Sequence, residues 1–126
     1  MTKSEELVSL LIDKGHTISF AESCTGGMAA ASIVDVADAS KVLNASFVTY
    51  ANEAKIKYAN VSGETLDKYG AVSEQTAGEM AEGAAKANNA DVAVGISGIA
   101  GPTGGDRKST RLNSSHSTSS RMPSSA

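Results

Sequence analysis

Two short apolar segments constrain the fold most strongly, because each leads directly into a glycine-rich loop. Residues 17–21 (TISFA) have the length and the β-branched and aromatic content of a strand, and they precede the loop ESCTGG. Residues 91–98 (DVAVGISG) form a second apolar run of strand length, which IAGPTGG follows. Helical patterns lie between these strands, which favours crossover connections and therefore a parallel or mixed sheet.

The predicted elements have the order α-β-α-β-α-α-β. A helix is predicted to begin at Thr2, whose capping-box spacing to Glu5 precedes an apolar stripe, and to end at Gly15. Asn52 and Ser73 are predicted to cap two later helices, because short polar side chains accept from the free N–H groups of a first turn. The other expected elements are a helix over 28–38, a strand over 43–51 and about one helical turn within 61–73.

This order predicts an α/β fold, a three-layer sandwich with a mainly parallel or mixed sheet that helices cover on both faces. Only three strands are recognisable, so we expect the fold to be incomplete at the C-terminus. The body of the chain, residues 1–105, is predicted to form one domain, since its length allows a real core.

Composition excludes several classes of protein. The first 105 residues hold seven lysines, no arginine and thirteen acidic residues, a charge that disfavours contact with a nucleic-acid backbone. No apolar stretch reaches the roughly eighteen residues of a membrane span, and the charged N-terminus is not a signal peptide. A single cysteine excludes an internal disulfide, and no Cys/His spacing suggests zinc. We therefore expect a cytoplasmic protein without a metal, a membrane or a nucleic-acid partner.

Residues 106–126 differ from the rest of the chain. Serine dominates this segment, one acidic residue stands against three arginines and one lysine, and no helical or strand period is present. So few apolar residues cannot bury enough surface to offset the ordering entropy, which predicts disorder. The stretch DRKSTRLNSSH resembles a translated reading frame of a DNA-sequencing adapter, so we interpret the segment as an artefact and assign it no function.

Both glycine-rich loops stand where ligands bind in open α/β sheets, beyond the carboxyl ends of the strands. Their glycines let backbone amides approach a ligand closely. The loop ESCTGG also leads into a helix, whose N-terminus favours an anion. Both loops can therefore hold a phosphate.

A nucleophile is available at the first of these loops, where Ser23 and Cys24 stand at the strand-to-helix turn. A serine hydroxyl needs a base to take its proton. His16 precedes the first strand and lies at the opposite end of the sheet, and His116 belongs to the serine-rich segment, so neither histidine suits this role. The sequence therefore disfavours a Ser-His-Asp arrangement.

Lys55 is the candidate base, because it lies one turn into a helix that begins at the same sheet edge as Ser23. A lysine acts as a base only when it is neutral, which requires burial or a nearby cation. Tyr50 ends the preceding strand and can hydrogen-bond within this pair or to a substrate.

Each of these residues also has a purely structural interpretation. A Ser-Cys pair before two glycines serves as a plain N-cap, and Lys55 on a short helix is normally a solvated charge. Cys24 is by default a small buried hydrophobe, and Tyr50 is more often a packing residue. From spacing alone the sequence supports an α/β domain with an anion-binding edge.

Four motifs in a fixed order make the assignment more specific. AESCTGG is followed by FVTYANEAK, GAVSEQTAGEMA and SGIAGPTGG, over about Glu5 to Gly105. Together they resemble the competence/damage-inducible CinA C-terminal domain family, in its stand-alone form. The resemblance implies hydrolytic deamidation of nicotinamide mononucleotide to nicotinate mononucleotide and ammonia, in pyridine nucleotide recycling, with no metal or organic cofactor.

The resemblance also implies roles for individual residues. Ser23 is the expected nucleophile, Lys55 its base and Tyr50 an active-site tyrosine. The implied substrate-binding residues are Thr25, Gly26, Gly27, Ser97, Gly98 and Gly101. The first three are expected to offer backbone amides to the oxyanion or the phosphate. Full-length relatives are expected to be homo-oligomers.

After the GPTGG loop the chain departs from the family, whose members continue with further strands, a helix and a basic segment that binds the substrate phosphate through an arginine. Arg107 and Arg111 do not align with that arginine. We therefore expect a C-terminally truncated domain that is poorly folded or inactive as written. Two alternatives stay open: a non-catalytic nucleotide-binding or competence-related module, and an amidase that uses Cys24 as its nucleophile.

Overall fold

Three parallel strands form the central layer of the fold. The computed structural model describes residues 1–98. In sheet order the strands are β2 (Phe47–Val48), β1 (Ile18–Glu22) and β3 (Val92–Ile96). Ala21 of β1 lies opposite Phe47 on one side and Gly95 on the other. The predicted α/β class with a parallel sheet is confirmed, and the segment 106–126 lies outside the described residues.

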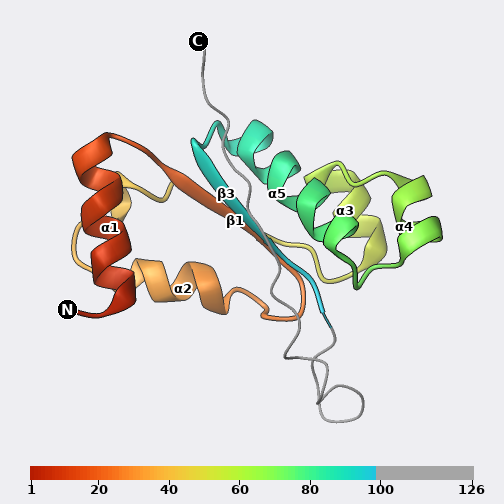
Figure 1. Cartoon of the computed structure of the whole chain (residues 1–126), viewed down its shortest axis with the longest axis horizontal. Coiled ribbons are helices and arrows are strands. Elements are labelled where there is room, and N and C mark those ends of the chain that lie inside the picture. The colour runs from red at the N-terminus through yellow and green to blue at the C-terminus, as the bar shows by residue number, and fades with distance from the viewer. Residues whose placement is uncertain (99–126) are drawn as a thin grey trace.

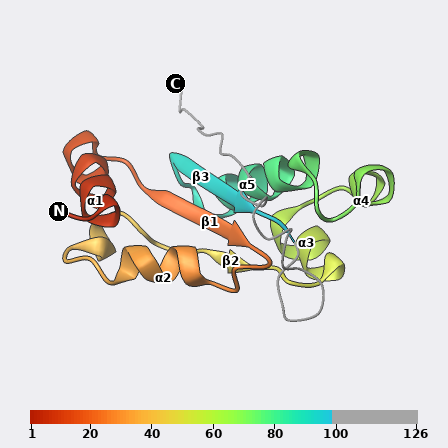
Figure 2. The same ribbon diagram turned by 60° about the horizontal axis from the view of Figure 1, so that its bottom comes forward.

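Helices cover both faces of this sheet (Figures 1 and 2). They are α1 (Lys3–Lys14), α2 (Met28–Val34), the 3₁₀ turn η1 (Ala39–Lys41), α3 (Asn52–Ala59), α4 (Gly63–Tyr69) and α5 (Glu74–Asn88). On one face, Val8 and Leu11 of α1 share an apolar cluster with Phe20 of β1. On the other face, Met80 of α5 clusters with Ala21 of β1, and α3 and α4 pack against α5. Apart from the 3₁₀ turn η1, the elements have the order α-β-α-β-α-α-α-β, which has one helix, α4, more than the predicted α-β-α-β-α-α-β order.

Two glycines allow α5 to approach its neighbours closely. A Cβ atom on Gly95 of β3 would lie 2.0 Å from the carbonyl oxygen of Ala77 on α5. A Cβ atom on Gly83 of α5 would lie 1.7 Å from the carbonyl oxygen of Ala59 on α3. Neither position has room for a side chain, so α5 lies directly on the sheet and on α3.

The predicted helix ends agree with the structure at three of four positions. Thr2 and Glu5 form a reciprocal capping box, and Gly15 ends α1 with a φ of 69°. The Ser73 hydroxyl oxygen accepts from the Thr76 N–H over 3.1 Å at the start of α5. The prediction for Asn52 is wrong, because Ala51 is the N-cap residue of α3 and Asn52 is its first helical residue.

The strand predicted over 43–51 pairs regularly only at β2. Residues before it run beside β1, but side chains replace the regular strand pairing there. The Ser46 hydroxyl oxygen accepts from the Phe20 N–H over 3.0 Å, and the Ser19 hydroxyl donates to the Ala45 carbonyl over 2.7 Å. The hydrogen-bonding serines therefore shorten this strand while they keep its course along β1.

Two helices differ in length from the prediction. α2 ends at Val34, and Asp38 then takes a φ of 70°, which turns the chain into η1. α4 is seven residues long where about one turn was expected. The Ser62 hydroxyl oxygen accepts from the Glu64 N–H over 3.1 Å, and this capping stabilises the extra length.

Candidate active site

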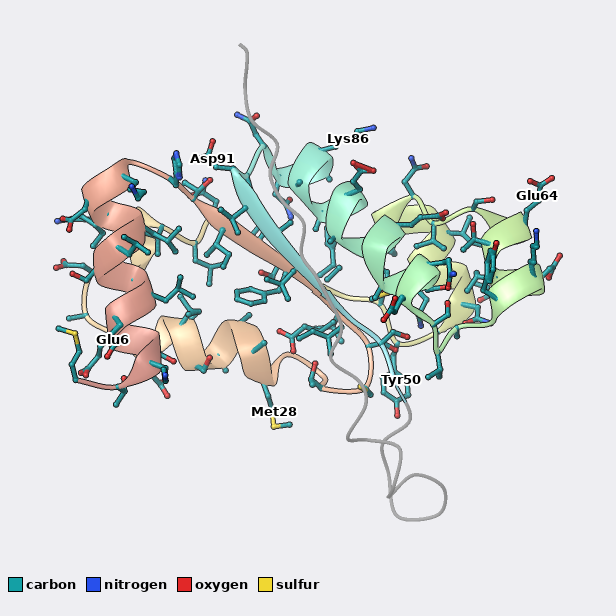
Figure 3. The ribbon with its side chains drawn as sticks, viewed as in Figure 1. Glu6, Met28, Tyr50, Glu64, Lys86 and Asp91 are labelled. Atoms are coloured by element: carbon teal, nitrogen blue, oxygen red, sulfur yellow. The ribbon has the colours of Figure 1, made fainter. Side chains whose placement is uncertain are left out.

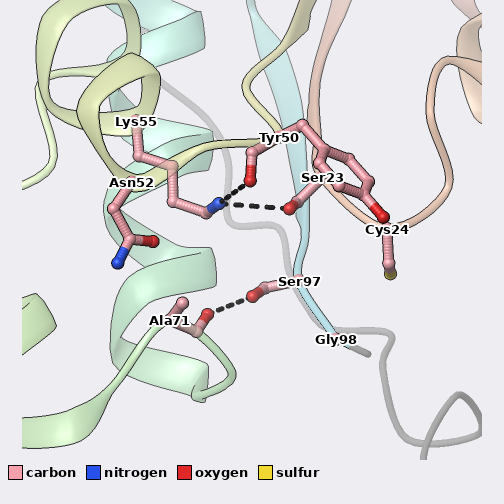
Figure 4. Close-up of a pocket in the computed structure, with 8 residues that line it drawn as sticks. All are labelled: Ser23, Cys24, Tyr50, Asn52, Lys55, Ala71, Ser97 and Gly98. Atoms are coloured by element: carbon pink, nitrogen blue, oxygen red, sulfur yellow. Dashed lines mark hydrogen bonds between the residues drawn. The ribbon is translucent and has the colours of Figure 1, made fainter. Parts of the chain in front are cut away.

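A pocket of about 200 Å³ opens at the carboxyl ends of β1 and β3, beside the first turn of α3 (Figure 4). Its lining residues are Ser23, Cys24, Tyr50, Asn52, Lys55, Ala71, Ser97 and Gly98. The structure thus brings together six residues that the sequence singled out, namely Ser23, Cys24, Tyr50, Lys55, Ser97 and Gly98, whereas Thr25, Gly26 and Gly27 do not line this pocket. Gly101 lies outside the described residues.

Ser23 comes directly after β1 and is still held by the sheet. Its N–H donates to the Ile96 carbonyl of β3 over 3.1 Å, which continues the pairing of the two strands. Only 6% of the residue is exposed. Because the backbone is fixed in this way, the Ser23 hydroxyl has a defined position at the floor of the pocket.

The Lys55 side chain extends from the first turn of α3 to Ser23 (Figure 4). Its Nζ atom lies 3.1 Å from the Ser23 Oγ and donates to the carbonyl oxygens of Thr49 and Tyr50 over 2.9 and 3.0 Å. The residue is 1% exposed. All three partners are neutral oxygen atoms, so no carboxylate among these contacts stabilises a charged amine.

Burial also changes the acidity of this amine. Removal from water disfavours the ammonium form and lowers the pKa of Lys55 below its ordinary value, while the negative charge of a Cys24 thiolate acts in the opposite direction. A larger fraction of Lys55 is therefore neutral at a given pH than of a solvent-exposed lysine. A neutral amine beside a hydroxyl can accept its proton.

Tyr50 contributes its main-chain carbonyl group to the site, and its aromatic ring lies beside the pocket. The carbonyl oxygen contacts Lys55, whereas the side chain is 64% exposed and projects from the sheet edge (Figures 3 and 4). Sequence reasoning missed the carbonyl contacts of Thr49 and Tyr50. It also missed Asn52 and Ala71 as lining residues, and only the position of Asn52 just after a strand pointed to the site.

The thiol of Cys24 lies at the rim of the same pocket. Burial raises the pKa of Cys24, and the N–H groups of Cys24 and Thr25 partly oppose this rise. The negative charge of Glu22 raises the pKa further, whereas Lys55 lowers it slightly. Cys24 thus forms a thiolate less readily than an ordinary cysteine, and the Lys55 amine contacts the hydroxyl of Ser23.

The amides of the glycines in this loop already have partners inside the protein. The Gly26 N–H donates to the Ser23 carbonyl over 3.0 Å, and the Gly27 N–H donates to the Glu22 Oε1 over 3.1 Å. The sequence suggested that these two amides bind a phosphate or an oxyanion. In the structure both already donate to oxygen atoms of the protein. Within the described residues, no oxygen atom accepts from the N–H groups of Cys24 and Thr25.

Ser97 and Gly98 form the wall of the pocket that β3 supplies (Figure 4). Ser97 is 5% exposed, and its hydroxyl donates to the carbonyl oxygen of Ala71. This bond joins the end of β3 to the segment before α5. The hydroxyl therefore fixes the wall of the pocket as it stands.

Residues 1–98 contain neither a candidate metal site nor a membrane-spanning helix. That part of the chain contains no group of three His, Cys, Asp or Glu side chains placed to hold a metal ion. None of its helices has the length and apolar character to cross a bilayer.

Comparison with known proteins gives consistent matches. The family model described as the CinA C-terminal domain matches residues 1–111. A CinA-like protein from Kosmotoga olearia is 56% identical over 101 residues, which is 80% of this chain and 24% of that protein. A CinA-like protein from Shewanella piezotolerans is 54% identical over 102 residues, or 81% of this chain and 24% of that protein. The chain thus spans about a quarter of the length of these curated relatives.

Solved structures agree with the sequence matches. A competence-damaged protein (CinA) superfamily protein from Escherichia coli has a TM-score of 0.77 and 41% identity, and the match covers 82% of this chain and 60% of that one. A competence/damage inducible protein from Agrobacterium tumefaciens has a TM-score of 0.74 and 44% identity, with 84% and 67% covered. At these identities the likeness extends beyond the fold to the sequence itself.

Proposed function

The chain belongs to the CinA C-terminal domain family, and on this premise we propose that it is an amidohydrolase that deamidates nicotinamide mononucleotide. Ser23 is the nucleophile and Lys55 is its base. The observation that carries the proposal is the distance of 3.1 Å between Lys55 Nζ and Ser23 Oγ in a buried environment that lowers the pKa of the lysine. The products are nicotinate mononucleotide and ammonia.

The first step transfers a proton and forms an ester. Neutral Lys55 has two N–H bonds, which the carbonyl oxygens of Thr49 and Tyr50 accept, and one lone pair, which is left for the Ser23 O–H. As the proton moves to Nζ, Oγ attacks the carboxamide carbon. The resulting ammonium of Lys55 then gives the proton to the leaving nitrogen, and ammonia departs.

The second step regenerates the enzyme. A water molecule gives a proton to Lys55 and attacks the ester carbon, and the Ser23 oxygen leaves and takes that proton back. The product is the carboxylic acid, which ionises at neutral pH. Every proton in this cycle passes through Lys55, and none of the proposed steps involves a metal or an organic cofactor.

The negative oxygen of each tetrahedral intermediate needs hydrogen-bond donors. The N–H groups of Cys24 and Thr25 suit this role, because no oxygen of the described residues accepts from them. Both groups favour the thiolate form of Cys24, so they stabilise negative charge at this rim of the pocket. The exposed ring of Tyr50 offers a surface on which a nicotinamide ring can stack.

The two alternatives make different demands on this site. An amidase that uses Cys24 needs a thiolate, which the raised pKa of the thiol disfavours. A non-catalytic module needs no base beside Ser23, so burial of a lysine there would bring no advantage. The relatives' names mention competence and damage induction and state no catalytic activity.

Ammonia release from nicotinamide mononucleotide tests the proposal. It should be measured for this chain and for a version extended with the C-terminal segment of the Agrobacterium tumefaciens relative, because the match covers 67% of that protein. In the more active form, Lys55→Met and Ser23→Ala should abolish turnover. Lys57→Met is the matched control, since Lys57 is an exposed lysine of the same helix. Turnover that survives Ser23→Ala would overturn the proposal.

A further inference from the structure

Glu22 is the only buried acidic residue among residues 1–98, and it immediately precedes Ser23. Its exposed fraction is 0%. A carboxylate removed from water is strongly destabilising unless hydrogen-bond donors surround it. The reason for its burial therefore lies in the groups that it contacts.

Four donors from the next eight residues converge on this carboxylate. The Thr25 hydroxyl donates to Oε1 over 2.6 Å, and the N–H groups of Gly27 and Ala29 donate to the same oxygen over 3.1 and 3.0 Å. The Ala30 N–H donates to Oε2 over 2.8 Å. Both carboxylate oxygens of Glu22 thus accept hydrogen bonds, and both face the first turn of α2.

The start of α2 lacks a capping side chain of its own. Its N-cap residue is Gly27, with a φ of 103°, a conformation that a residue with a side chain rarely adopts. A glycine cannot supply the oxygen that normally caps a first turn. Glu22 supplies it from the preceding strand, and its negative charge suits the positive end of the helix.

The backbone of Glu22 is fixed as firmly as its side chain. Its carbonyl oxygen accepts from the Thr49 N–H over 2.8 Å, and the carbonyl oxygen of Thr49 in turn accepts from Lys55 Nζ. The next N–H, that of Ser23, donates to Ile96. Glu22 therefore links the sheet, the turn over residues 24–27 and the segment that holds the lysine.

We propose that Glu22 is a positioning residue of the active site, whose carboxylate clamps the turn over residues 24–27. The clamp keeps Ser23 in reach of Lys55 and holds in place the N–H groups of Cys24 and Thr25, from which no oxygen atom of residues 1–98 accepts. It also means that the anion at the start of α2 belongs to the protein itself, so the substrate phosphate binds elsewhere. The catalytic part of this inference rests on the proposed function.

Glu22→Gln is the informative variant, because it keeps the shape of the side chain and removes one acceptor atom and the charge. At least one of the three N–H groups then faces an NH₂ group instead of an oxygen. Amide hydrogen exchange of this chain should become at least tenfold faster at Gly27, Ala29 or Ala30 and stay unchanged in α5. In the form that turns over, kcat should fall about 100-fold, while KM should change less than threefold.

Glu79→Gln is the matched control. Glu79 of α5 accepts from the Ser62 N–H over 2.8 Å and from the Thr65 hydroxyl over 2.6 Å. Its carboxylate thus makes the same kinds of hydrogen bond to the start of α4 that Glu22 makes to the start of α2. This variant should alter exchange near Ser62 and leave kcat unchanged. Equal losses of kcat in the two variants would mean that Glu22 acts only on stability, and this result would overturn the proposal.

Two further results separate the possible failures. If Glu22→Gln does not fold, Thr25→Val removes one of the four donors and leaves the carboxylate, and kcat should then fall threefold or more at an unchanged KM. Normal kcat in that variant overturns the proposal. If no form releases ammonia, the proposed function fails, and the exchange data alone decide whether Glu22 clamps the turn.

Discussion

Lys55 Nζ lies 3.1 Å from Ser23 Oγ, although 32 residues separate the two in the chain. The contact arises because β1 ends and α3 begins at the same edge of the sheet. The carbonyl oxygens of Thr49 and Tyr50 bind the amine from its other side. Burial of this lysine lowers its pKa, and no carboxylate among these contacts opposes that effect.

The rate of deamidation should rise with pH and level off above the lowered pKa of Lys55. The reason is that only the neutral amine accepts the Ser23 proton, and burial brings this pKa below its ordinary value of 10.5. The measurement is kcat/KM between pH 5 and 10. Lys55→Arg should be inactive throughout, since a guanidinium stays protonated. A profile that falls with rising pH would contradict Lys55 as the base.

The same shift of pKa couples stability to pH. Between the lowered pKa of folded Lys55 and the ordinary pKa of the unfolded chain, the unfolded state binds the additional proton. The contribution of Lys55 is therefore most favourable above the unfolded pKa and is lost as pH falls through the folded pKa. Lys55→Met should gain stability relative to the wild type as pH decreases in urea unfolding. A difference that does not vary with pH would refute the shift.

Replacement of Cys24 should have little effect on turnover. The thiol has a raised pKa, and the Lys55 amine is directed at the neighbouring hydroxyl. Cys24→Ala should therefore change kcat/KM less than about threefold, whereas Ser23→Ala should lower it about 1,000-fold or more. Ammonia release measures both variants. The reverse result, with activity kept in Ser23→Ala and lost in Cys24→Ala, would make the thiol the nucleophile.

The Tyr50 ring should affect substrate binding more than the chemical step. Tyr50 contacts Lys55 through its carbonyl oxygen, which every variant retains, and its ring is 64% exposed beside the pocket. Stacking is worth about 0.5–1.5 kcal/mol, so Tyr50→Ala should raise KM roughly twofold to tenfold with kcat nearly unchanged. Tyr50→Phe should resemble the wild type. Tyr69→Ala, at an exposed tyrosine of α4, is the control, and a large loss of kcat in Tyr50→Phe would instead assign a role to the hydroxyl.

The positions of Ser23 and Lys55 were predictable because strand ends follow from local sequence. A short apolar strand before each loop fixes the edge of a parallel sheet, and residues just after such strands meet there. The caps at Thr2 and Ser73 were predictable for the same reason, since their partners lie three residues away. The two caps depend on contacts that are close in the chain, whereas the Ser23–Lys55 contact follows from the ends of two adjacent parallel strands.

The contacts that surround the pair were not predictable in the same way. The carbonyl oxygens of Thr49 and Tyr50 are main-chain groups, which carry no mark in the sequence. The sequence placed Glu22 in the loop, but it is the last residue of β1 and lies on the same face as Phe20. Four hydrogen-bond donors from the following turn and helix offset the cost of burying its carboxylate. The sequence predicted that the N-terminus of that helix binds a phosphate. In the structure, the Glu22 carboxylate accepts from the N–H groups there.

Added side chains at the α5 contacts should destabilise the fold. A Cβ atom at Gly83 or Gly95 would meet backbone carbonyl oxygens at 1.7 and 2.0 Å, and a backbone cannot move aside as a flexible side chain does. Gly83→Ala and Gly95→Ala should each lower the free energy of unfolding by about 3 kcal/mol or more. Urea unfolding of each variant against the wild type measures this.

Gly78→Ala is the matched control on the same helix, because a Cβ atom there has no neighbour within 4 Å. Alanine loses less backbone entropy than glycine on folding, so this variant should be about 0.5–1 kcal/mol more stable than the wild type. Gly83→Ala should also move α3, and with it Lys55, away from Ser23, so it should reduce turnover even below its unfolding temperature. Wild-type stability in Gly83→Ala and Gly95→Ala would show that α5 does not lie as close to β3 and α3 as the structure has it.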